Sequence, residues 1–173
     1  GQRCHAAFSG DVAPALLVLG AEVELVSARG TRRMPLADLY RDDGAAHLTI
    51  ARDELLSAVH VPPAESALRS GYRKARARGA MDFPLAGVAC ALTLRDGVIA
   101  GLRVALTGTN SNPFVLAGGE DFIGRPVDDE LLAQRGKRVQ KQVSPRRSTV
   151  TQSNYRRRVA AVLAQRLVSE RCA

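Results

Sequence analysis

The sequence predicts an α+β protein, a fold class indicated by three observations. Residues 70–78 alternate with a period of two, and an apolar run, a tight turn and a returning segment follow up to residue 108, a pattern typical of strands. From residue 126 onward, apolar residues recur three and four positions apart, as in amphipathic helices. Pro62 and Pro63 separate these regions from a shorter leading part of the chain. We therefore expect a three-stranded antiparallel sheet packed on a helical bundle, preceded by part of another subdomain.

The leading part is predicted to be a helix followed by a hairpin. Ser9 or Asp11 can cap a short helix that tolerates Pro14 in its first turn and stops at Gly20. The segment AEVELVS alternates with period two, ARG supplies a turn, and TRRMPL begins a returning strand. LADLY then predicts a short helical turn and RDDGAAH a polar loop. The segment DELLSAVHVP predicts a further strand, or a helix that turns into one.

The second part of the chain opens with the basic segment SGYRKARAR. Its alternation predicts a strand over residues 70–78, with Tyr72 and Lys74 on one face and Arg73 on the other. The apolar run at 85–94, the turn RDG and the segment VIAGLRVALTG predict two more antiparallel strands. Helices follow over PVDDELLAQRGKRVQKQV and over SNYRRRVAAVLAQRLVSE, the latter capped by Ser153. We expect the apolar stripe of the last helix to consist of Tyr155, Val159, Val162, Leu163 and Leu167.

The strongly basic composition suggests one alternative function. The chain has 25 Lys and Arg against 17 Asp and Glu, giving a net charge of +8 and a pI of about 10.2. Such a charge suits a polyanion, so a nucleic-acid-binding module is possible in principle. Aromatic residues make up only 4% of the chain, which leaves few side chains to stack on bases. The cations that such a module would use are Arg69, Arg73, Lys74, Arg76, Arg78 and Arg156 to Arg158. A third possibility is a scaffold whose last helix docks an acidic partner through Arg156 to Arg158.

Several other classes of function lack support in the sequence. The widely spaced Cys4, Cys90 and Cys172 argue against a disulfide framework, and Cys90 is expected in the core. No histidine lies in a nucleophile-and-base pattern, and the chain has no CxxC, HExxH, Walker or dinucleotide motif. No apolar window reaches the length of a membrane span and no signal peptide is visible, so we expect a cytoplasmic protein without a membrane partner. Scattered polar groups on an ordinary scaffold favour a domain that holds a large cofactor.

Four blocks of the sequence together resemble a known family. In order, they are SGDVAPALLVLGAEVELVSARGTRRMPLADLY, DELLSAVHVP, YRKARARGAMDFPLAGVACAL and SNYRRRVAAVLAQRL. They resemble the flavin-binding medium subunit of the molybdenum hydroxylase (xanthine dehydrogenase) family, and most of all the beta subunit of 4-hydroxybenzoyl-CoA reductase. The resemblance implies that residues 1–63 are part of a second FAD-binding subdomain. It implies that residues 64–173 form the flavoprotein C-terminal domain, with its sheet over 70–108 and helices over 126–170, so that the chain is the C-terminal portion of a longer subunit.

The same resemblance implies FAD as the cofactor and four residues at its site. Asp11 would lie near the ribityl-diphosphate region, where a carboxylate can accept hydrogen bonds from hydroxyls. Leu56 would lie against the flavin, and Tyr72 and Lys74 match the Y-x-K element of the family. Lys74 would approach the carbonyl edge of the isoalloxazine ring, where a cation stabilises the negative charge of reduced flavin. Without the resemblance, Asp11 would be a helix cap, Leu56 a core residue and Lys74 a solvated lysine.

Two more residues gain expected roles from the match. Asp82, in the family's DFP element, is expected to close a turn and to pair with Arg76 or Arg78. Cys4 lies in RCHAAFSGD, which resembles the stretch with the last cysteine ligand of an extra [4Fe-4S] cluster. Such a cluster needs four thiolates, so we expect it in the complete subunit only.

The resemblance finally implies an oxidoreductase subunit that transfers electrons and has no catalytic residue of its own. FAD would relay electrons toward molybdenum, for reductive dehydroxylation of 4-hydroxybenzoyl-CoA in anaerobic aromatic degradation. The implied partners are a molybdenum-cofactor large subunit and a [2Fe-2S] small subunit in a dimer of heterotrimers, with no nucleic acid. The equivalent subunit of another enzyme, acting on a related CoA ester or an aldehyde, would keep the same scaffold.

Overall fold

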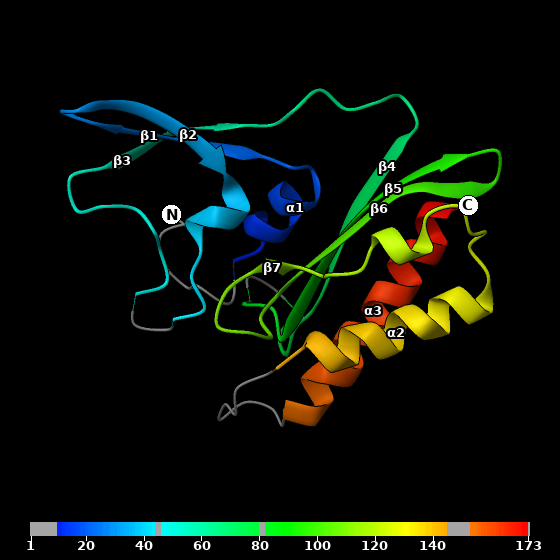
Figure 1. The fold of residues 1–173 in the computed structure, drawn as a ribbon. Coiled ribbons are helices and arrows are strands. Elements are labelled where there is room, and N and C mark those ends of the chain that lie inside the picture. Colours follow the sequence, from blue (N-terminus) through cyan, green and yellow to red (C-terminus); the bar gives the residue numbers. More distant parts are fainter. Residues whose placement is uncertain (1–9, 44–45, 80–81, 145–152, 173) are drawn as a thin grey trace.

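The fold combines two antiparallel sheets with helices (Figure 1). A computed structural model describes residues 10–43, 46–79, 82–144 and 153–172 of the 173-residue chain. The α+β class expected from the sequence is confirmed. Besides the strands and α-helices, two short 3-10 helices are present among the described residues: η1 (Leu36–Leu39) and η2 (Glu120–Phe122).

The smaller sheet forms from the leading part of the chain. Helix α1 (Val12–Val18) ends at a left-handed turn in which Gly20 has φ +69°, a conformation that glycine adopts without strain. Strands β1 (Glu22–Ser27) and β2 (Gly30–Pro35) form a hairpin, and β3 (Leu55–His60) pairs with the other edge of β1. The expected order of helix and hairpin is confirmed, and DELLSAVHVP contributes a strand.

The larger sheet has the strand order β4-β5-β6-β7, with every neighbouring pair antiparallel. Its strands are β4 (Leu68–Ala75), β5 (Ala86–Arg95), β6 (Val98–Thr107) and β7 (Phe114–Val115). The first three were predicted. The fourth was missed because two residues are too few for an alternating pattern to be recognised.

Strand β4 ends earlier than the sequence predicted. Its last residue, Ala75, accepts a hydrogen bond from the Leu85 backbone N–H at 2.8 Å. Beyond it, the Arg78 backbone N–H donates to the Asp82 carboxylate at 3.0 Å, and the Arg78 guanidinium pairs with the same carboxylate at 3.2 Å. Because Asp82 takes this N–H, the segment closes a turn and does not extend the sheet. The pairing of Asp82 with Arg78 was one of the two pairings that the sequence predicted.

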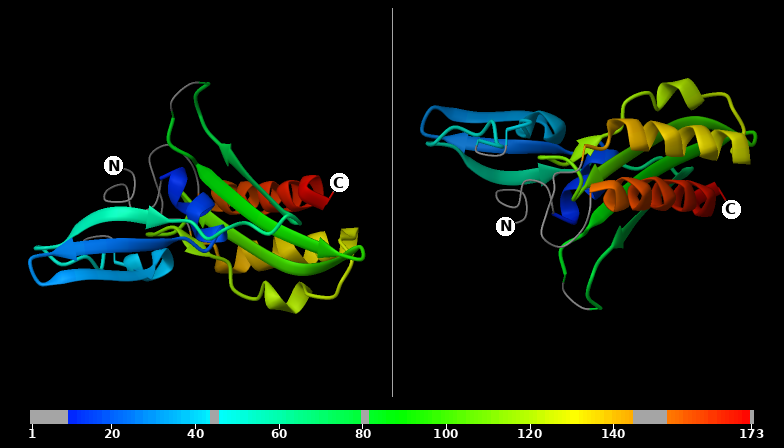
Figure 2. Two further views of the ribbon diagram at one scale, coloured as in Figure 1. Left: turned by 90° about the horizontal axis from the view of Figure 1, so that it is seen from above. Right: turned by 90° about the horizontal axis from the view of Figure 1, so that it is seen from below.

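Different helices cover the two faces of the larger sheet (Figures 1 and 2). Helices α2 (Asp129–Gln142) and α3 (Ser153–Cys172) lie side by side on one face, and α1 packs on the other. Alternate residues of β5 belong to the two resulting cores. Val88, Cys90 and Leu92 pack with α2 and α3, whereas Ala89 and Ala91 pack with α1.

The buried face of α3 differs from the predicted one. Tyr155 and Val162 were expected in its apolar stripe, but they are 52% and 42% exposed. The helix buries a neighbouring face that is rich in alanine and therefore packs closely on the sheet. The buried residues of α3 are Arg156, Ala160, Ala161, Ala164, Leu167 and Val168. Among the described residues, no helix combines the length and apolar character that a membrane crossing requires.

Candidate functional site

Three of the sequence-predicted site residues form one hydrogen-bonded cluster. The Tyr72 hydroxyl donates to Asp11 Oδ1 at 2.7 Å, and Lys74 Nζ donates to Asp11 Oδ2 at 2.5 Å. Lys74 Nζ also donates to the Asp82 backbone carbonyl at 3.1 Å. The Asp11 carboxylate thus holds a phenol and an ammonium side by side. We call Asp11, Tyr72 and Lys74 the acid-phenol-ammonium cluster.

The larger sheet and α1 together build this cluster. Tyr72 and Lys74 are two residues apart on β4, so they face the α1 side of the sheet, as alternation predicted. Arg73 between them faces the other way and pairs with Glu170 of α3 at 2.9 Å. Asp11 is the N-cap residue of α1, yet its side chain makes no capping hydrogen bond. Its carboxylate reaches β4 instead, so the alternative role as a helix cap does not describe it.

Burial and charge shape the chemistry of the cluster. Burial, and then the hydrogen bond to the Asp11 carboxylate, raise the pKa of Tyr72 well above its usual value. The phenol therefore remains a neutral hydrogen-bond donor throughout the physiological range. The side chains of Lys74 and Asp11 are 21% and 31% exposed, so their ion pair lies at a partly solvated edge. A ligand at this edge would meet a cation whose charge is offset by a carboxylate.

Exposed apolar side chains adjoin the cluster in the sequence. Val12 follows Asp11 and is 53% exposed, and Phe83 follows Asp82 and is 65% exposed. Each is therefore next to a hydrogen-bond partner of Lys74. Exposed apolar groups beside fixed polar groups are typical of a surface that holds an aromatic ligand.

Leu56 is not part of the hydrogen-bonded cluster. It lies on β3 in the smaller sheet, opposite Leu25 of β1, and its side chain is half-buried. It packs against the same core on which Tyr72 packs. The structure therefore places Leu56 on the α1 side of the molecule but in a different sheet from Tyr72 and Lys74.

The described cysteines are not arranged to hold a metal. Cys4 lies outside the described residues. Cys90 is fully buried, and burial raises the pKa of its thiol to about 12, which keeps it protonated. Within the described residues, no group of three or more His, Cys, Asp or Glu side chains could hold a metal ion.

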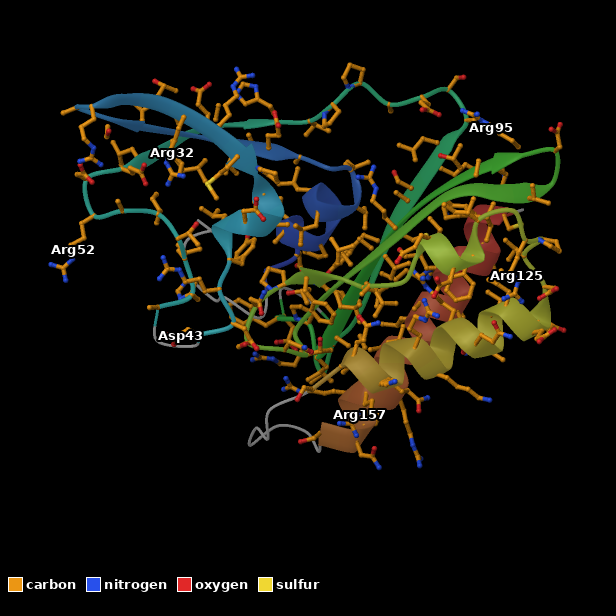
Figure 3. The ribbon with its side chains drawn as sticks, viewed as in Figure 1. Arg32, Asp43, Arg52, Arg95, Arg125 and Arg157 are labelled. Atoms are coloured by element: carbon orange, nitrogen blue, oxygen red, sulfur yellow. The ribbon has the colours of Figure 1, made fainter. Side chains whose placement is uncertain are left out.

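The cations proposed for nucleic-acid binding do not form one open patch. Lys74 is bound to Asp11, Arg73 to Glu170 and Arg78 to Asp82. Arg156 is buried and donates to the Gly108 carbonyl at 3.0 Å. Other arginines are scattered over the molecule, as the labelled ones in Figure 3 show. This arrangement gives no support to a phosphate-binding strand.

Comparison with protein families matches nearly the whole chain. Residues 70–171, more than half of the chain, match the CO dehydrogenase flavoprotein C-terminal domain. Residues 1–64 match the FAD binding domain in molybdopterin dehydrogenase. The chain belongs to the flavoprotein subunits of the molybdenum hydroxylase family. The two matches meet between residues 64 and 70, close to the boundary that Pro62 and Pro63 predicted.

Individual relatives of this flavoprotein agree with the assignment. The glyceraldehyde dehydrogenase medium chain of Sulfolobus acidocaldarius is 28% identical over 98% of this chain and 59% of its own length. The aldehyde oxidoreductase FAD-binding subunit PaoB of Escherichia coli is 38% identical over 76% of this chain and 42% of its own. A structure of CO dehydrogenase from Oligotropha carboxidovorans superposes with a TM-score of 0.87 at 25% identity, over 94% of this chain and 56% of that one. The flavoprotein chain described here thus spans about 59% of the length of the first of these relatives.

Two features of the cluster were missed from the sequence. Alternation placed Tyr72 and Lys74 on one face, but no local pattern shows that Asp11, 61 residues before Tyr72, joins them. The exposed Phe83 was read only as part of the DFP element. No sequence signal marks it, because single exposed apolar residues are common on protein surfaces.

Proposed function

We propose that this flavoprotein chain is part of an FAD-carrying electron-transfer subunit of a molybdenum-flavin-iron-sulfur oxidoreductase. We further propose that the acid-phenol-ammonium cluster forms one edge of its flavin site. One observation carries the proposal: the cluster joins three residues from two parts of the chain, each of which matches a flavoprotein family. Leu56 is proposed as an apolar neighbour of the flavin.

The chemistry of the cluster fits the edge of a flavin. A lysine ammonium has three N–H donors, and the described residues Asp11 and Asp82 accept two of the three from Lys74. The third can meet a carbonyl oxygen of an isoalloxazine ring. Val12 and Phe83 supply exposed apolar surface of the kind that a flat aromatic ring covers. When bound, FAD would supply the two-electron redox chemistry.

Lys74 and Asp11 act on the redox balance in opposite directions. The ammonium stabilises negative charge at the ring edge, which favours reduced flavin and raises its reduction potential. The carboxylate at 2.5 Å offsets part of that charge. Tyr72 holds the carboxylate through a hydrogen bond from its neutral phenol and so fixes its distance from Lys74.

The opposing effects of Lys74 and Asp11 predict that two variants shift the flavin reduction potential in opposite directions. In the FAD-loaded holoenzyme, Lys74→Ala should lower the flavin potential, and Asp11→Asn should raise it. We expect shifts of about 30 mV or more, which correspond to about 1.4 kcal/mol for a two-electron couple. Redox titration followed by flavin absorbance measures both.

Arg73→Ala is the matched control, because Arg73 lies on the same strand but faces α3. It should leave the potential at the wild-type value. Unchanged potentials and unchanged FAD affinity in both cluster variants would contradict the proposed site.

The proposal extends to partners and substrate. We infer a molybdenum-cofactor large subunit and a [2Fe-2S] small subunit as partners, because the matched relatives are medium or FAD-binding subunits by name. Within this class we propose the 4-hydroxybenzoyl-CoA reductase type, supported by the DFP element and by the residues around Cys4. The named relatives act on other substrates, so turnover of 4-hydroxybenzoyl-CoA by the holoenzyme, against an aldehyde, decides between them. An iron assay with Cys4→Ser would show in parallel whether Cys4 helps to hold a [4Fe-4S] cluster.

A further inference from the structure

The positive charge of the molecule is concentrated in one segment. Ten of the 25 basic residues lie between 131 and 169, where the sequence contains no Asp or Glu. The rest of the chain has fifteen basic and all seventeen acidic residues, which gives it a net charge of −2. This segment contains α2 from Leu131, the third residue of the helix, onward and nearly all of α3. The helical layer is therefore cationic, and the two-sheet part is not.

Some of these cations are used inside the protein. Arg135 is fully buried, with its guanidinium 5.2 Å from the centre of the Phe122 ring. Arg138 pairs with Asp121 at 2.7 Å. Arg157 donates to the Val143 carbonyl at 3.2 Å. With the buried Arg156, these side chains are occupied within the protein, so the docking role first considered for Arg156 to Arg158 cannot involve all three.

Four other cations of the helical layer face outward. Lys137 and Lys141 on α2, and Arg158 and Arg166 on α3, are exposed, and no carboxylate of the described residues lies within ion-pairing distance of them. On α3, Arg158 and Arg166 share their side of the helix with the exposed Tyr155 and Val162, because residues three, seven and eleven apart lie on one face. This side is opposite the alanine-rich face that packs on the sheet. We call the set the cationic helix face: Lys137, Lys141, Tyr155, Arg158, Val162 and Arg166.

We propose that the cationic helix face docks an acidic surface of a partner subunit. The identification of the partner as a subunit of the same enzyme rests on the proposed function, but the chemistry of the face does not. A surface rich in like charges gains most from a partner of opposite charge, which also steers the encounter. Arginine and tyrosine are enriched in protein interfaces, and Tyr155 and Val162 provide the apolar contacts that an interface needs at its centre.

A protein partner fits this face better than a nucleic acid. Only one aromatic side chain, Tyr155, is exposed on it, so it lacks a series of rings on which bases could stack. On α3, its two cations are separated by the exposed Val162, an arrangement that matches another packed surface. The partner expected is therefore a carboxylate-rich protein surface with small apolar patches.

The first experiment reverses charge in the assembled enzyme. Arg158→Glu with Arg166→Glu should weaken association with the partner subunits by at least about tenfold, and should flatten its dependence on salt. Arg52→Glu with Arg95→Glu is the matched control. It changes the charge equally at exposed arginines that lie away from α2 and α3 in Figure 3. Native mass spectrometry over a salt series measures assembly, and the FAD content of every sample is read from absorbance.

A second experiment uses the scarcity of lysine. The chain has only three lysines, and Lys74 is held by Asp11 on the other side of the larger sheet. Carbodiimide joins amines to carboxylates at zero length, so links between subunits should start at Lys137 or Lys141 and end on partner Asp or Glu residues. Peptide mass spectrometry identifies them, and Lys137→Arg with Lys141→Arg should abolish them without preventing assembly.

The outcomes separate the proposals. Wild-type association of the Arg158→Glu, Arg166→Glu variant would overturn the docking proposal. It would also be overturned if that variant assembled normally but lost binding to a labelled DNA duplex that the wild type bound. A holoenzyme that assembles through this face without FAD would contradict the proposed flavin function and leave the docking proposal supported.

Discussion

Tyr72 can reach Asp11 because the residue beneath its phenol has no side chain. Gly87 of β5 is fully buried and lies opposite Lys74 of β4 and Thr107 of β6. A Cβ atom at Gly87 would lie 2.5 Å from the Tyr72 hydroxyl oxygen and 2.7 Å from the Thr107 methyl carbon, both closer than van der Waals contact allows. The glycine is required for space and not for an unusual backbone conformation.

We therefore expect Gly87→Ala to displace the Tyr72 hydroxyl from Asp11. Overpacking of this kind costs about 1–3 kcal/mol of unfolding free energy. Loss of the hydrogen bond to Asp11 should also lower the pKa of Tyr72 toward its ordinary value, because that bond is one of the causes that raise it. Carbon-13 NMR of labelled tyrosine measures this pKa, and only Tyr40 and Tyr155 contribute other signals.

A control and a rescue distinguish displacement from general damage. Gly101→Ala on β6 is the control, because its Cβ would meet Thr93 at an ordinary 3.8 Å. Adding Tyr72→Phe to Gly87→Ala removes the clashing hydroxyl and should restore part of the lost stability. An unchanged Tyr72 pKa in Gly87→Ala would show that Gly87 does not position the phenol.

Among the elements, α2 depends on one capping residue. Asp128 is extended, and its carboxylate accepts a hydrogen bond from the Leu131 backbone N–H at 2.7 Å. Asp128→Ala should lower the unfolding free energy by about 1 kcal/mol, whereas Asp128→Asn keeps an acceptor and should stay close to wild type. Urea denaturation followed by circular dichroism measures both. Equal losses of unfolding free energy in the two variants would contradict a role for the Asp128 cap in stabilising α2.

The elements also show how far the sequence could predict the fold. Period-two alternation located β1 and β4, whereas β5 and β6 were located by an apolar run, the RDG turn and a returning segment, since both faces of β5 are buried. The side of α3 that is buried was predicted incorrectly, since large apolar residues such as Tyr155 and Val162 dominate a periodicity pattern. Small residues such as Ala160 and Ala164 carry little hydrophobic signal, yet they bring the helix closest to the sheet.

The candidate site was predictable only in part. The family resemblance selected Asp11, Leu56, Tyr72 and Lys74, and strand alternation placed two of them on one face. The convergence of Tyr72 and Lys74 on the Asp11 carboxylate depends on how α1 packs over the alanines of β5 and β6, which is a tertiary contact that no local pattern encodes. The role of Gly87 was not predicted for the same reason, because the neighbours of a strand glycine are known only from the pairing of the strands.

For the whole molecule, the acidic residues of the smaller sheet predict a loss of stability in acid. The hydrogen bond from Arg32 lowers the pKa of Glu54 to about 2, and hydrogen bonds from Ser57 and His60 lower that of Glu24. A carboxyl whose folded pKa is depressed stabilises the fold above its unfolded pKa, and this contribution disappears as pH falls through the folded pKa. The loss for Glu54 should therefore fall between about pH 4.5 and 2.

Urea midpoints measured across this pH range test the prediction. Glu54→Gln should show a shallower decline than wild type, because its side chain has no proton to take up. Glu65→Gln is the control, since that carboxylate is 69% exposed and lies 3.7 Å from Arg95. Identical declines for wild type and Glu54→Gln would count against the role of the Arg32–Glu54 pair.

The net charge of the molecule is concentrated on its helical side. Residues 129–173, which supply α2 and α3, contain eleven basic and three acidic residues, whereas residues 1–128 contain fourteen of each and carry no net charge. In the field of an acidic body, such a molecule turns its helices forward before any contact forms. The acid-phenol-ammonium cluster, on the opposite side of the larger sheet, then faces away from that body, which would leave it open to the flavin proposed for it. The distribution of charged residues along the sequence thus orients the molecule during approach. Added salt weakens this orienting effect because it shortens the Debye length.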